Sequence, residues 1–210
     1  SHQWLEEEKL QAAKIFKMVK CGIVSVLKSD PHKQIAEKYK CLAAMNGGGF
    51  SDPGGVGTGA QPMGLTYSGG KCVWEAGGKH TFIGITKNNE LISAEQMTKA
   101  KADELGIRDG VSFLPGNTLI QKEGDSVKLL YGDKNTGTSQ RSAIAQRADG
   151  AMILLVTDGR SAASVGATRN DIIDILVEYG AVSAGMLDGG SSSMLYYENY
   201  IEKSRACLYV

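Results

Sequence analysis

A chain of 210 residues that is 42% hydrophobic and 22% charged has the composition of a globular protein able to bury a core. Lysine plus arginine (23) balances aspartate plus glutamate (23), so the chain has no basic surplus to hold a nucleic acid or an anionic membrane surface. It contains no apolar run long enough to span a membrane and no recognisable signal peptide.

Glycine and cysteine are the two residue types whose placement is informative. The 27 glycines gather in three segments, 46–59, 64–78 and 185–190, which indicates tight turns and close backbone approaches. The four cysteines are far apart and form no CxxC pair, which argues against a zinc knuckle. Their even number permits one or two disulfide bonds without requiring them.

Strands and hairpins dominate the prediction for the first 131 residues. Residues 1–14 are expected to form a helix or linker ahead of a single domain spanning 15–210. The glycine-rich segment 46–62 is flanked by strands on both sides. Strands are predicted at 15–27 (one or two), 42–45, 63–67, 71–74, 81–87, 90–93, 110–114, 118–122 and 126–131, and helices at 33–40 and at 93–107, the latter with Ser93 as cap and Gly106 as stop.

The segment 141–160, "RSAIAQRADGAMILLVTDGR", has the pattern of a β-hairpin centred on Asp149-Gly150. Asp-Gly between two strand-like runs favours a two-residue type I′ turn. Such a turn places Ala148 opposite Ala151, and counting outward places Arg141 directly opposite Asp158 on the same face of the sheet.

A β-α-β unit is predicted to follow this hairpin. Thr168 and Asp171 form a capping-box pattern at the start of a helix that ends at Gly180. The helix connects a strand at 151–157 to a buried strand at 182–187, and crossovers of this kind join parallel strands. We therefore predict an α+β fold: a single domain with a mixed, largely antiparallel sheet, hairpins and a C-terminal β-α-β unit.

Parallel strands 151–157 and 182–187 end at the same edge of the sheet. Asp158 and Asp188, which follow them, are then expected to share that edge with Arg141 and Arg160, where open sheets place their ligand sites. Two carboxylates beside a guanidinium suit hydrolysis of a glycosidic or phosphate bond, and equally a sugar-binding or calcium site.

The sequence resembles the phosphodiester glycosidase family. The resemblance is carried by "AAMNGGGF" (43–50), "SQRSAIAQRADGAMILLVTDGR" (139–160) and "SVGATRNDIIDILVEYGAVSAGMLDGGSSSM" (164–194). Central blocks such as "GVGTGAQPMGLTYSGGK" are similar to a bacterial branch associated with exopolysaccharide biosynthesis. The likeness covers residues 15–210. Ser142, Ala145 and Ser191 stand where the family commonly has Thr, Gly and Gly.

The resemblance implies a hydrolase that releases a sugar from a phosphate-linked partner on a glycan or glycoconjugate, outside the cell or on its surface, with any leader or anchor lying outside this sequence. The residues expected to be catalytic are Asp158, Asp188 and Arg141. The residues expected to bind substrate are Asn46, Gly47, Gly48, Gln61, Arg160, Gly189, Gly190, Ser191 and Ser192.

A phosphate monoester departs more readily than an alcohol, so the reaction needs a cationic clamp and a carboxylate rather than strong proton donation. Arg141 and Arg160 suit the clamp, and the two aspartates divide the remaining roles. The amides of Asn46 and Gln61 suit sugar hydroxyls, although Asn46 is equally suited to a turn. No cofactor is expected, with a divalent cation as the alternative.

Three alternatives to the glycosidase remain on these observations. One is a non-catalytic carbohydrate-binding or cell-envelope module of the same fold. Another is a metal-dependent phosphodiesterase that cuts the P–O bond. A serine hydrolase is disfavoured because no GxSxG elbow exists and the histidines, at positions 2, 32 and 80, all lie in the N-terminal half.

Overall fold

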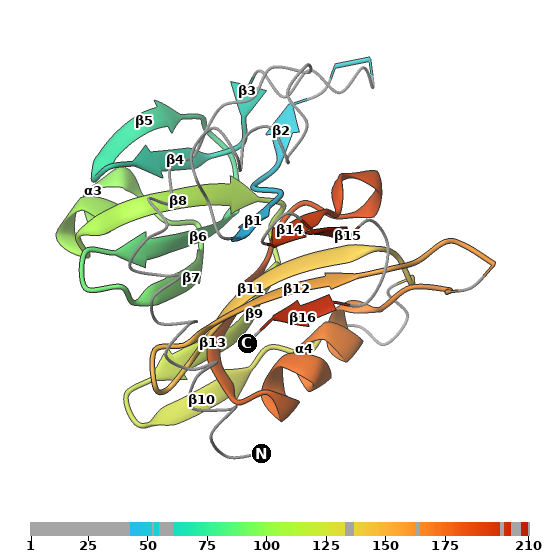
Figure 1. Ribbon diagram of the computed structural model, residues 1–210. Coiled ribbons are helices and arrows are strands. Elements are labelled where there is room, and N and C mark those ends of the chain that lie inside the picture. Colours follow the sequence, from blue (N-terminus) through green and yellow to red (C-terminus); the bar gives the residue numbers. More distant parts are fainter. Residues whose placement is uncertain are drawn as a thin grey trace.

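Two β-sheets packed against each other form the body of the protein in the computed structural model (Figure 1). The structure describes residues 43–51, 53–54, 61–132, 137–162, 164–197, 200–202 and 207–209. The segments predicted at 1–14, 15–27 and 33–40 lie outside the described residues.

The first sheet has five antiparallel strands in the order β5-β4-β8-β6-β7. It is built from two hairpins, at the strands predicted from the sequence, and a fifth strand that follows the short helix α3 (Lys99–Glu104). Its strands are β4 (Leu65–Ser68), β5 (Lys71–Glu75), β6 (Thr81–Thr86), β7 (Leu91–Glu95) and β8 (Ile107–Phe113).

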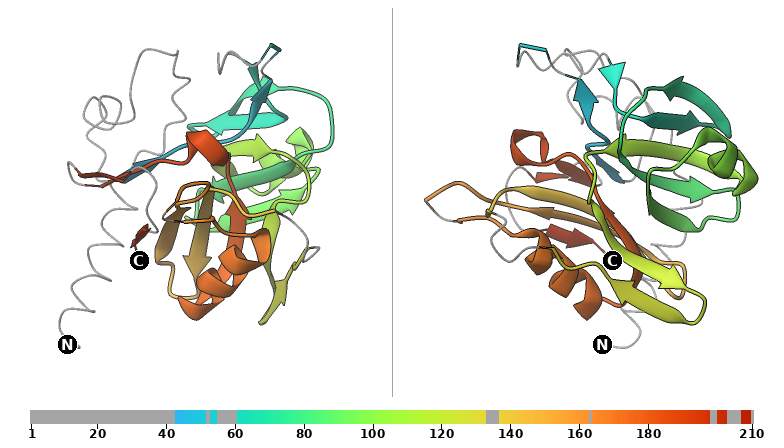
Figure 2. Two further views of the ribbon diagram at one scale, coloured as in Figure 1. Left: turned by 90° about the vertical axis from the view of Figure 1, so that its right-hand side faces the viewer. Right: turned by 180° about the vertical axis from the view of Figure 1, so that it is seen from behind.

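The second sheet has six strands in the order β10-β9-β13-β11-β12-β16, and the helix α4 (Arg169–Glu178) packs on its outer face (Figure 2). Its strands are β9 (Thr118–Glu123), β10 (Ser126–Leu129), β11 (Arg141–Arg147), β12 (Met152–Thr157), β13 (Ala181–Met186) and β16 (Cys207–Tyr209). Smaller elements are β1 (Ala43–Met45), β2 (Phe50–Ser51), β3 (Gln61–Pro62), the 3-10 turn η1 (Gly190–Ser192), β14 (Leu195–Tyr197) and β15 (Tyr200–Glu202).

Three apolar clusters hold these layers together. The first lies between α4 and the six-stranded sheet and includes the helix residues Ile172, Ile173 and Leu176, all 0% exposed. A second lies between α3 and the five-stranded sheet. The third joins the two sheets, with Ile83 of one packed in the same cluster as Met152 of the other. The order of layers is therefore helix, sheet, sheet, helix, and the fold is α+β as predicted.

The helix predicted at 93–107 is wrong in its first half. Residues 91–95 form β7, and Ser93, which was expected to cap the helix, is buried and donates to Thr118 Oγ1 over 3.1 Å. The cap is Thr98, whose Oγ1 accepts from the Lys101 N–H. Pairing with β6 and burial between the sheets override the helical pattern here, whereas Gly106 ends the helical segment at φ +65° as expected.

The predicted β-α-β unit is confirmed. Both β12 and β13 pair antiparallel with β11, so they run parallel to each other with β11 between them. The connecting helix α4 begins with a complete capping box formed by Thr168 and Asp171. The carboxyl ends of β12 and β13 consequently share one edge of the sheet with the first residue of β11.

The predicted register of the β11–β12 hairpin is wrong by one residue. Arg141 pairs with Thr157, and not with Asp158. The turn has three residues, because the Arg147 N–H bonds to the Ala151 carbonyl and Gly150 adopts φ +86°. Asp149-Gly150 thus forms the end of a three-residue loop with a left-handed glycine rather than a type I′ turn, and every expected cross-strand pair moves by one position.

Candidate active site

Two Asp-Gly turns meet at the residues that lead into β11. The Gly190 N–H donates to the Gln140 carbonyl over 3.0 Å, and a Cβ placed on Gly189 would lie 3.0 Å from the same oxygen. A Cβ placed on Gly159 would lie 2.8 Å from the Gln140 nitrogen. Since β13 and β12 flank β11, the turns after Asp188 and Asp158 approach Gln140 from its two sides. The shared edge expected for these two aspartates is therefore present.

Asp188 is partly buried and held through its backbone and its side chain. Its N–H donates to the Gly47 carbonyl over 3.0 Å. Its carboxylate accepts from the Gly189 N–H over 2.9 Å and from the Ser192 hydroxyl. Burial raises the pKa of the Asp188 carboxyl and outweighs these two hydrogen bonds, which act in the opposite direction. Asp188 is consequently a stronger base than an exposed aspartate.

Asp158 has a matching local geometry. Its Oδ1 accepts the Gly159 N–H over 2.6 Å, the same bond that Asp188 makes to Gly189. Residue 159 must be glycine because a Cβ at this position would lie within 2.8 Å of backbone atoms of Ser139, Gln140 and Gly166. A side chain at this position would push the Asp158 turn away from the start of β11.

Arg141 is fixed by backbone carbonyls rather than by an acid. Its Nε donates to Ala167 O over 3.1 Å and its Nη2 to Gly137 O over 2.8 Å. Burial, and then the neighbouring charge of Arg160, lower the pKa of Arg141. Within the described residues neither arginine has an ion-pair partner, and Arg141 forms no ion pair with Asp158. Two adjacent cations without a counter-ion suit an anionic ligand.

Asn46 lies at the same site but uses its amide inside the protein. It is 7% exposed, and its Nδ2 donates to the Asp188 carbonyl over 2.6 Å. Its Oδ1 accepts from the Ser142 hydroxyl over 2.9 Å and from the Met194 N–H over 3.0 Å. Asn46 does not have the positive φ of the turn role considered for it, and its amide instead joins the Asp188 turn to Ser142 and Met194.

The remaining predicted binding residues divide into two groups. Gly47, Gly189, Gly190 and Ser192 belong to the Asp188 turn through the bonds given above, and Ser191 is exposed beside them. Gly48 is set against β8 instead, because a Cβ there would lie 2.3 Å from Ser112 O. Gln61 is exposed in β3 opposite Ser51, and no hydrogen bond recorded among the described residues joins it to the Asp188 turn.

Sequence reasoning missed Gln140, Ser142 and Ser193. Ser142, 0% exposed, is the donor that orients Asn46. The Gln140 side-chain oxygen and the Ser193 hydroxyl are buried without a hydrogen-bond partner in the described part of the chain. The signals for these residues were their positions next to Arg141 and to the Asp188-Gly-Gly turn and, for Ser142, a place where the family commonly has Thr.

Nowhere in the described ranges do three or more His, Cys, Asp or Glu side chains gather in a way that could hold a metal ion. The helices of the described segments are too short and too polar to cross a bilayer. Cys72 is a free thiol.

Comparison with known proteins supports the resemblance seen in the sequence. The family model for phosphodiester glycosidase matches residues 39–207. The SPbeta prophage-derived uncharacterized protein YomE of Bacillus subtilis strain 168 is 41% identical over 58 residues, which are 28% of this chain and 9% of that protein. This chain thus matches a small part of that relative.

Solved structures show the same fold at low identity. The zebrafish N-acetylglucosamine-1-phosphodiester alpha-N-acetylglucosaminidase catalytic domain, auto-inhibited by its pro-peptide, matches with a TM-score of 0.63 and 22% identity, over 88% of this chain and 61% of that one. A hypothetical protein from Synechocystis matches with a TM-score of 0.54 and 14% identity, over 87% and 52%. A putative exported protein from Burkholderia pseudomallei K96243 matches with a TM-score of 0.52 and 13% identity, over 85% and 65%.

In each of these comparisons the chain spans less than two thirds of its relative's length. The family match nevertheless covers most of the chain, including β1, both Asp-Gly turns and Arg141. The chain belongs to the phosphodiester glycosidase family.

Proposed function

We propose that the chain is a hydrolase that cleaves a sugar 1-phosphodiester at the C–O bond between the anomeric carbon and the phosphate. The observation that carries this proposal is the meeting of the Asp158 and Asp188 turns at Gln140, directly beside the unpaired cations Arg141 and Arg160. Carboxylates next to a cationic clamp match the charge distribution of a sugar carbon bonded to phosphate.

Arg141 and Arg160 hold the phosphate in this proposal. The carbonyls of Ala167 and Gly137 fix the guanidinium of Arg141 through Nε and Nη2. Its Nη1 has no partner among the described residues, so it is available to a phosphate oxygen. A guanidinium that is already oriented loses little side-chain entropy on binding.

Asp188 acts as the general base. Because burial raises its pKa, its carboxylate accepts a proton from water more readily than an exposed aspartate does. Water attacks the anomeric carbon, the C–O bond breaks, and its electron pair leaves with the phosphate monoester. Throughout the reaction Asp158, on the other side of Gln140, accepts a hydrogen bond from a sugar hydroxyl.

A panel of sugar 1-phosphodiesters assayed in ¹⁸O-labelled water tests the reaction. We expect turnover in the presence of a chelator, with the label in the sugar. Label in the phosphate would indicate P–O cleavage and overturn the mechanism. Saturable binding without turnover would show a carbohydrate-binding module instead.

Asp188→Asn and Asp158→Asn test the site, with Asp149→Asn as the matched control. Asp149 is exposed at the far end of the β11–β12 hairpin and pairs with Arg147. We expect kcat to fall by about 10²–10⁴-fold in the two site variants, as for loss of an acid–base group, and to stay unchanged in the control. Equal activity in all three variants would remove both aspartates from the mechanism.

We further propose that the chain acts outside the cell or on its surface. A similar solved structure is described as a putative exported protein. Fractionation of cells producing the natural full-length protein tests this placement, since recovery from the cytosol alone would contradict it.

A further inference from the structure

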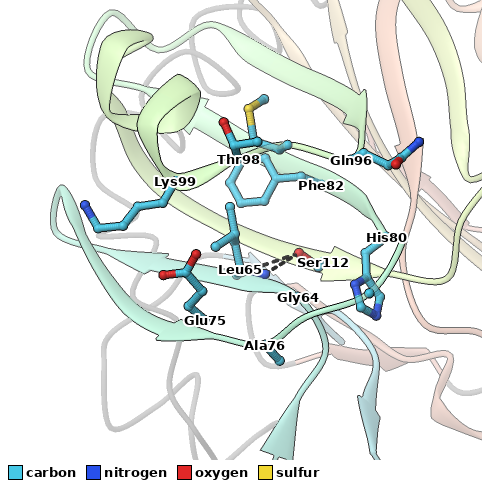
Figure 3. A pocket seen from close by; sticks show the side chains of 12 residues that line it. Gly64, Leu65, Glu75, Ala76, His80, Phe82, Gln96, Thr98, Lys99 and Ser112 are labelled. Atoms are coloured by element: carbon cyan, nitrogen blue, oxygen red, sulfur yellow. Dashed lines mark hydrogen bonds between the residues drawn. The ribbon is translucent and has the colours of Figure 1, made fainter.

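A cavity lies against the five-stranded sheet (Figure 3), and none of its lining residues belongs to the Asp188 site. Its volume is about 290 Å³. It opens where the ends of β4, β5, β6 and β8 meet the segment that leads into α3. Its lining residues are Gly64, Leu65, Glu75, Ala76, Gly78, His80, Phe82, Gln96, Met97, Thr98, Lys99 and Ser112.

The Phe82 ring forms part of the apolar wall of the cavity and is held in place by its neighbours. A Cβ on Gly84 would lie 2.6 Å from the Phe82 ring, and one on Gly110 would lie 2.3 Å from it. The ring therefore covers these two glycines and meets Tyr67 edge to face, at 6.1 Å between centroids. Elsewhere in the lining Gly64, Ser112 and His80 pack closely, because a Cβ on Gly64 would lie 2.7 Å from Ser112 Oγ and 3.1 Å from His80 Cγ.

The hydroxyl of Ser112, which lines the cavity, is already hydrogen-bonded within the protein. The Ser112 hydroxyl accepts from the Leu65 N–H and donates to the Leu65 carbonyl, both over 2.9 Å. Leu65, Phe82 and Met97 supply the apolar part of the lining. The six-residue helix α3 packs on the same face around Ala102 and Ile107, and its cap Thr98 and first residue Lys99 belong to the lining.

The two ends of the cavity carry polar side chains, with His80 and Gln96 at one end and Glu75 and Lys99 at the other (Figure 3). The His80 imidazole and the Glu75 carboxylate make no hydrogen bond within the described residues. Lys99 is already paired with Asp103 at 2.5 Å. The cavity therefore offers hydrogen-bonding groups at both ends but no free cation.

The rim at Gln96 is held in an unfavourable backbone conformation. Gln96 adopts φ +52°, and its N–H donates to the His80 carbonyl over 2.8 Å. The His80 ring in turn packs against Gly78, where a Cβ would lie 2.8 Å from Cε1. Non-glycine residues in this region of φ cost free energy and gather at ligand sites.

We propose that this cavity binds one uncharged sugar ring, independently of the catalytic site. Its volume lies just below the usual range for small-molecule sites, which suits a single ring. A hydrocarbon would form no hydrogen bond with His80 at one end or with the exposed Glu75 at the other, and an anion would face Glu75 while Lys99 is already paired with Asp103. A sugar ring presents C–H groups to Leu65 and Met97 and hydroxyls to both ends.

Saturation-transfer NMR and calorimetric titration with glucose, mannose and N-acetylglucosamine test the proposal, with inorganic phosphate and ethanolamine as charged comparisons. We expect saturable binding of at least one uncharged sugar, unchanged in Asp188→Asn. Ala76→Phe fills the cavity while keeping the backbone bond from Ala76 to Gly64, and Glu75→Gln removes the charge at nearly constant volume. We expect affinity to fall by about tenfold or more in Ala76→Phe.

The same variants separate this proposal from the hydrolase. Ala76→Phe and Glu75→Gln are expected to keep hydrolysis of a minimal sugar 1-phosphodiester, whereas Asp188→Asn loses it and keeps sugar binding. Three results would each overturn the proposal of a sugar site. The first is no sugar binding at millimolar concentration, and the second is a preference for phosphate or ethanolamine. The third is sugar binding that is lost in Asp188→Asn but kept in Ala76→Phe and Glu75→Gln.

Discussion

The side-chain amide of Asn46 donates to the backbone carbonyl of Asp188 over 2.6 Å, a contact between residues 142 positions apart in the chain. The acceptor side of the same amide is occupied by the Ser142 hydroxyl and the Met194 N–H. One buried side chain therefore ties the end of β1 to the turn that carries the proposed base. Asn46 thus holds Asp188 in position with an amide whose donor and acceptor are both used within the protein.

Replacing Asn46 by alanine is expected to reduce both stability and turnover. The variant leaves the Asp188 carbonyl, the Ser142 hydroxyl and the Met194 N–H without their partner, and each unsatisfied buried group costs about 1–3 kcal/mol. Urea unfolding measures the first effect and steady-state kinetics the second, with kcat falling more than KM rises. Asn88→Ala, at an exposed turn, is the control. Wild-type stability with a raised KM would instead indicate a direct sugar contact.

Ionisation of Asp188 is expected to lower the free energy of unfolding as the pH rises. Because burial raises its pKa in the folded state above the unfolded value of about 3.9, the folded protein takes up the proton first as the pH falls. The stability contributed by the protonated form is complete below the unfolded pKa and is lost as the pH rises through the folded pKa.

Asp188→Asn keeps an uncharged acceptor at this position and so removes this pH dependence. We expect the variant to be more stable than the wild type at neutral pH, and the difference to shrink as the pH falls toward about 4. The free energy of unfolding in urea, measured for both proteins across this range, checks the prediction. A variant that is less stable at every pH would contradict the assigned effect of burial.

Gly159→Ala is expected to disturb the Asp158 turn. The added methyl group would meet backbone atoms of Gly166, Gln140 and Ser139 within 2.8 Å, and backbone cannot move aside as a flexible side chain can. We expect a loss of stability of about 1–3 kcal/mol together with a lower kcat. Gly77→Ala is the matched control, since nothing lies within 4 Å of a Cβ there. An equal effect of the two substitutions would show that crowding at Gly159 is not the cause.

Thr168→Ala is expected to destabilise the crossover helix α4. It removes the hydroxyl that accepts from the Asp171 N–H over 3.1 Å, and loss of such a cap costs about 1 kcal/mol. Thr168→Ser retains the acceptor and should restore most of the stability. Thermal unfolding of the three proteins checks this, and a serine variant as unstable as the alanine variant would point to a role for the threonine methyl group.

Features that depend only on residues a few positions apart were predicted correctly from the local sequence. The capping box at Thr168 and the stop at Gly106 are governed by neighbours three or four positions away, and both are present. The helix expected from Ser93 failed because pairing with β6 and burial against β9 decide the state of residues 91–95. A propensity pattern contains no information about a partner strand.

The sequence by itself determined the α+β class, the crossover between β12 and β13, and the placement of Asp158 and Asp188 at one edge of the sheet. Those features follow from periodicity, from capping residues and from the direction that a helical crossover imposes. Only the tertiary structure decided that Arg141 pairs with Thr157 and that Asn46 holds the Asp188 turn. A register depends on the exact length of a turn, and a long-range hydrogen bond depends on folding that brings distant segments together.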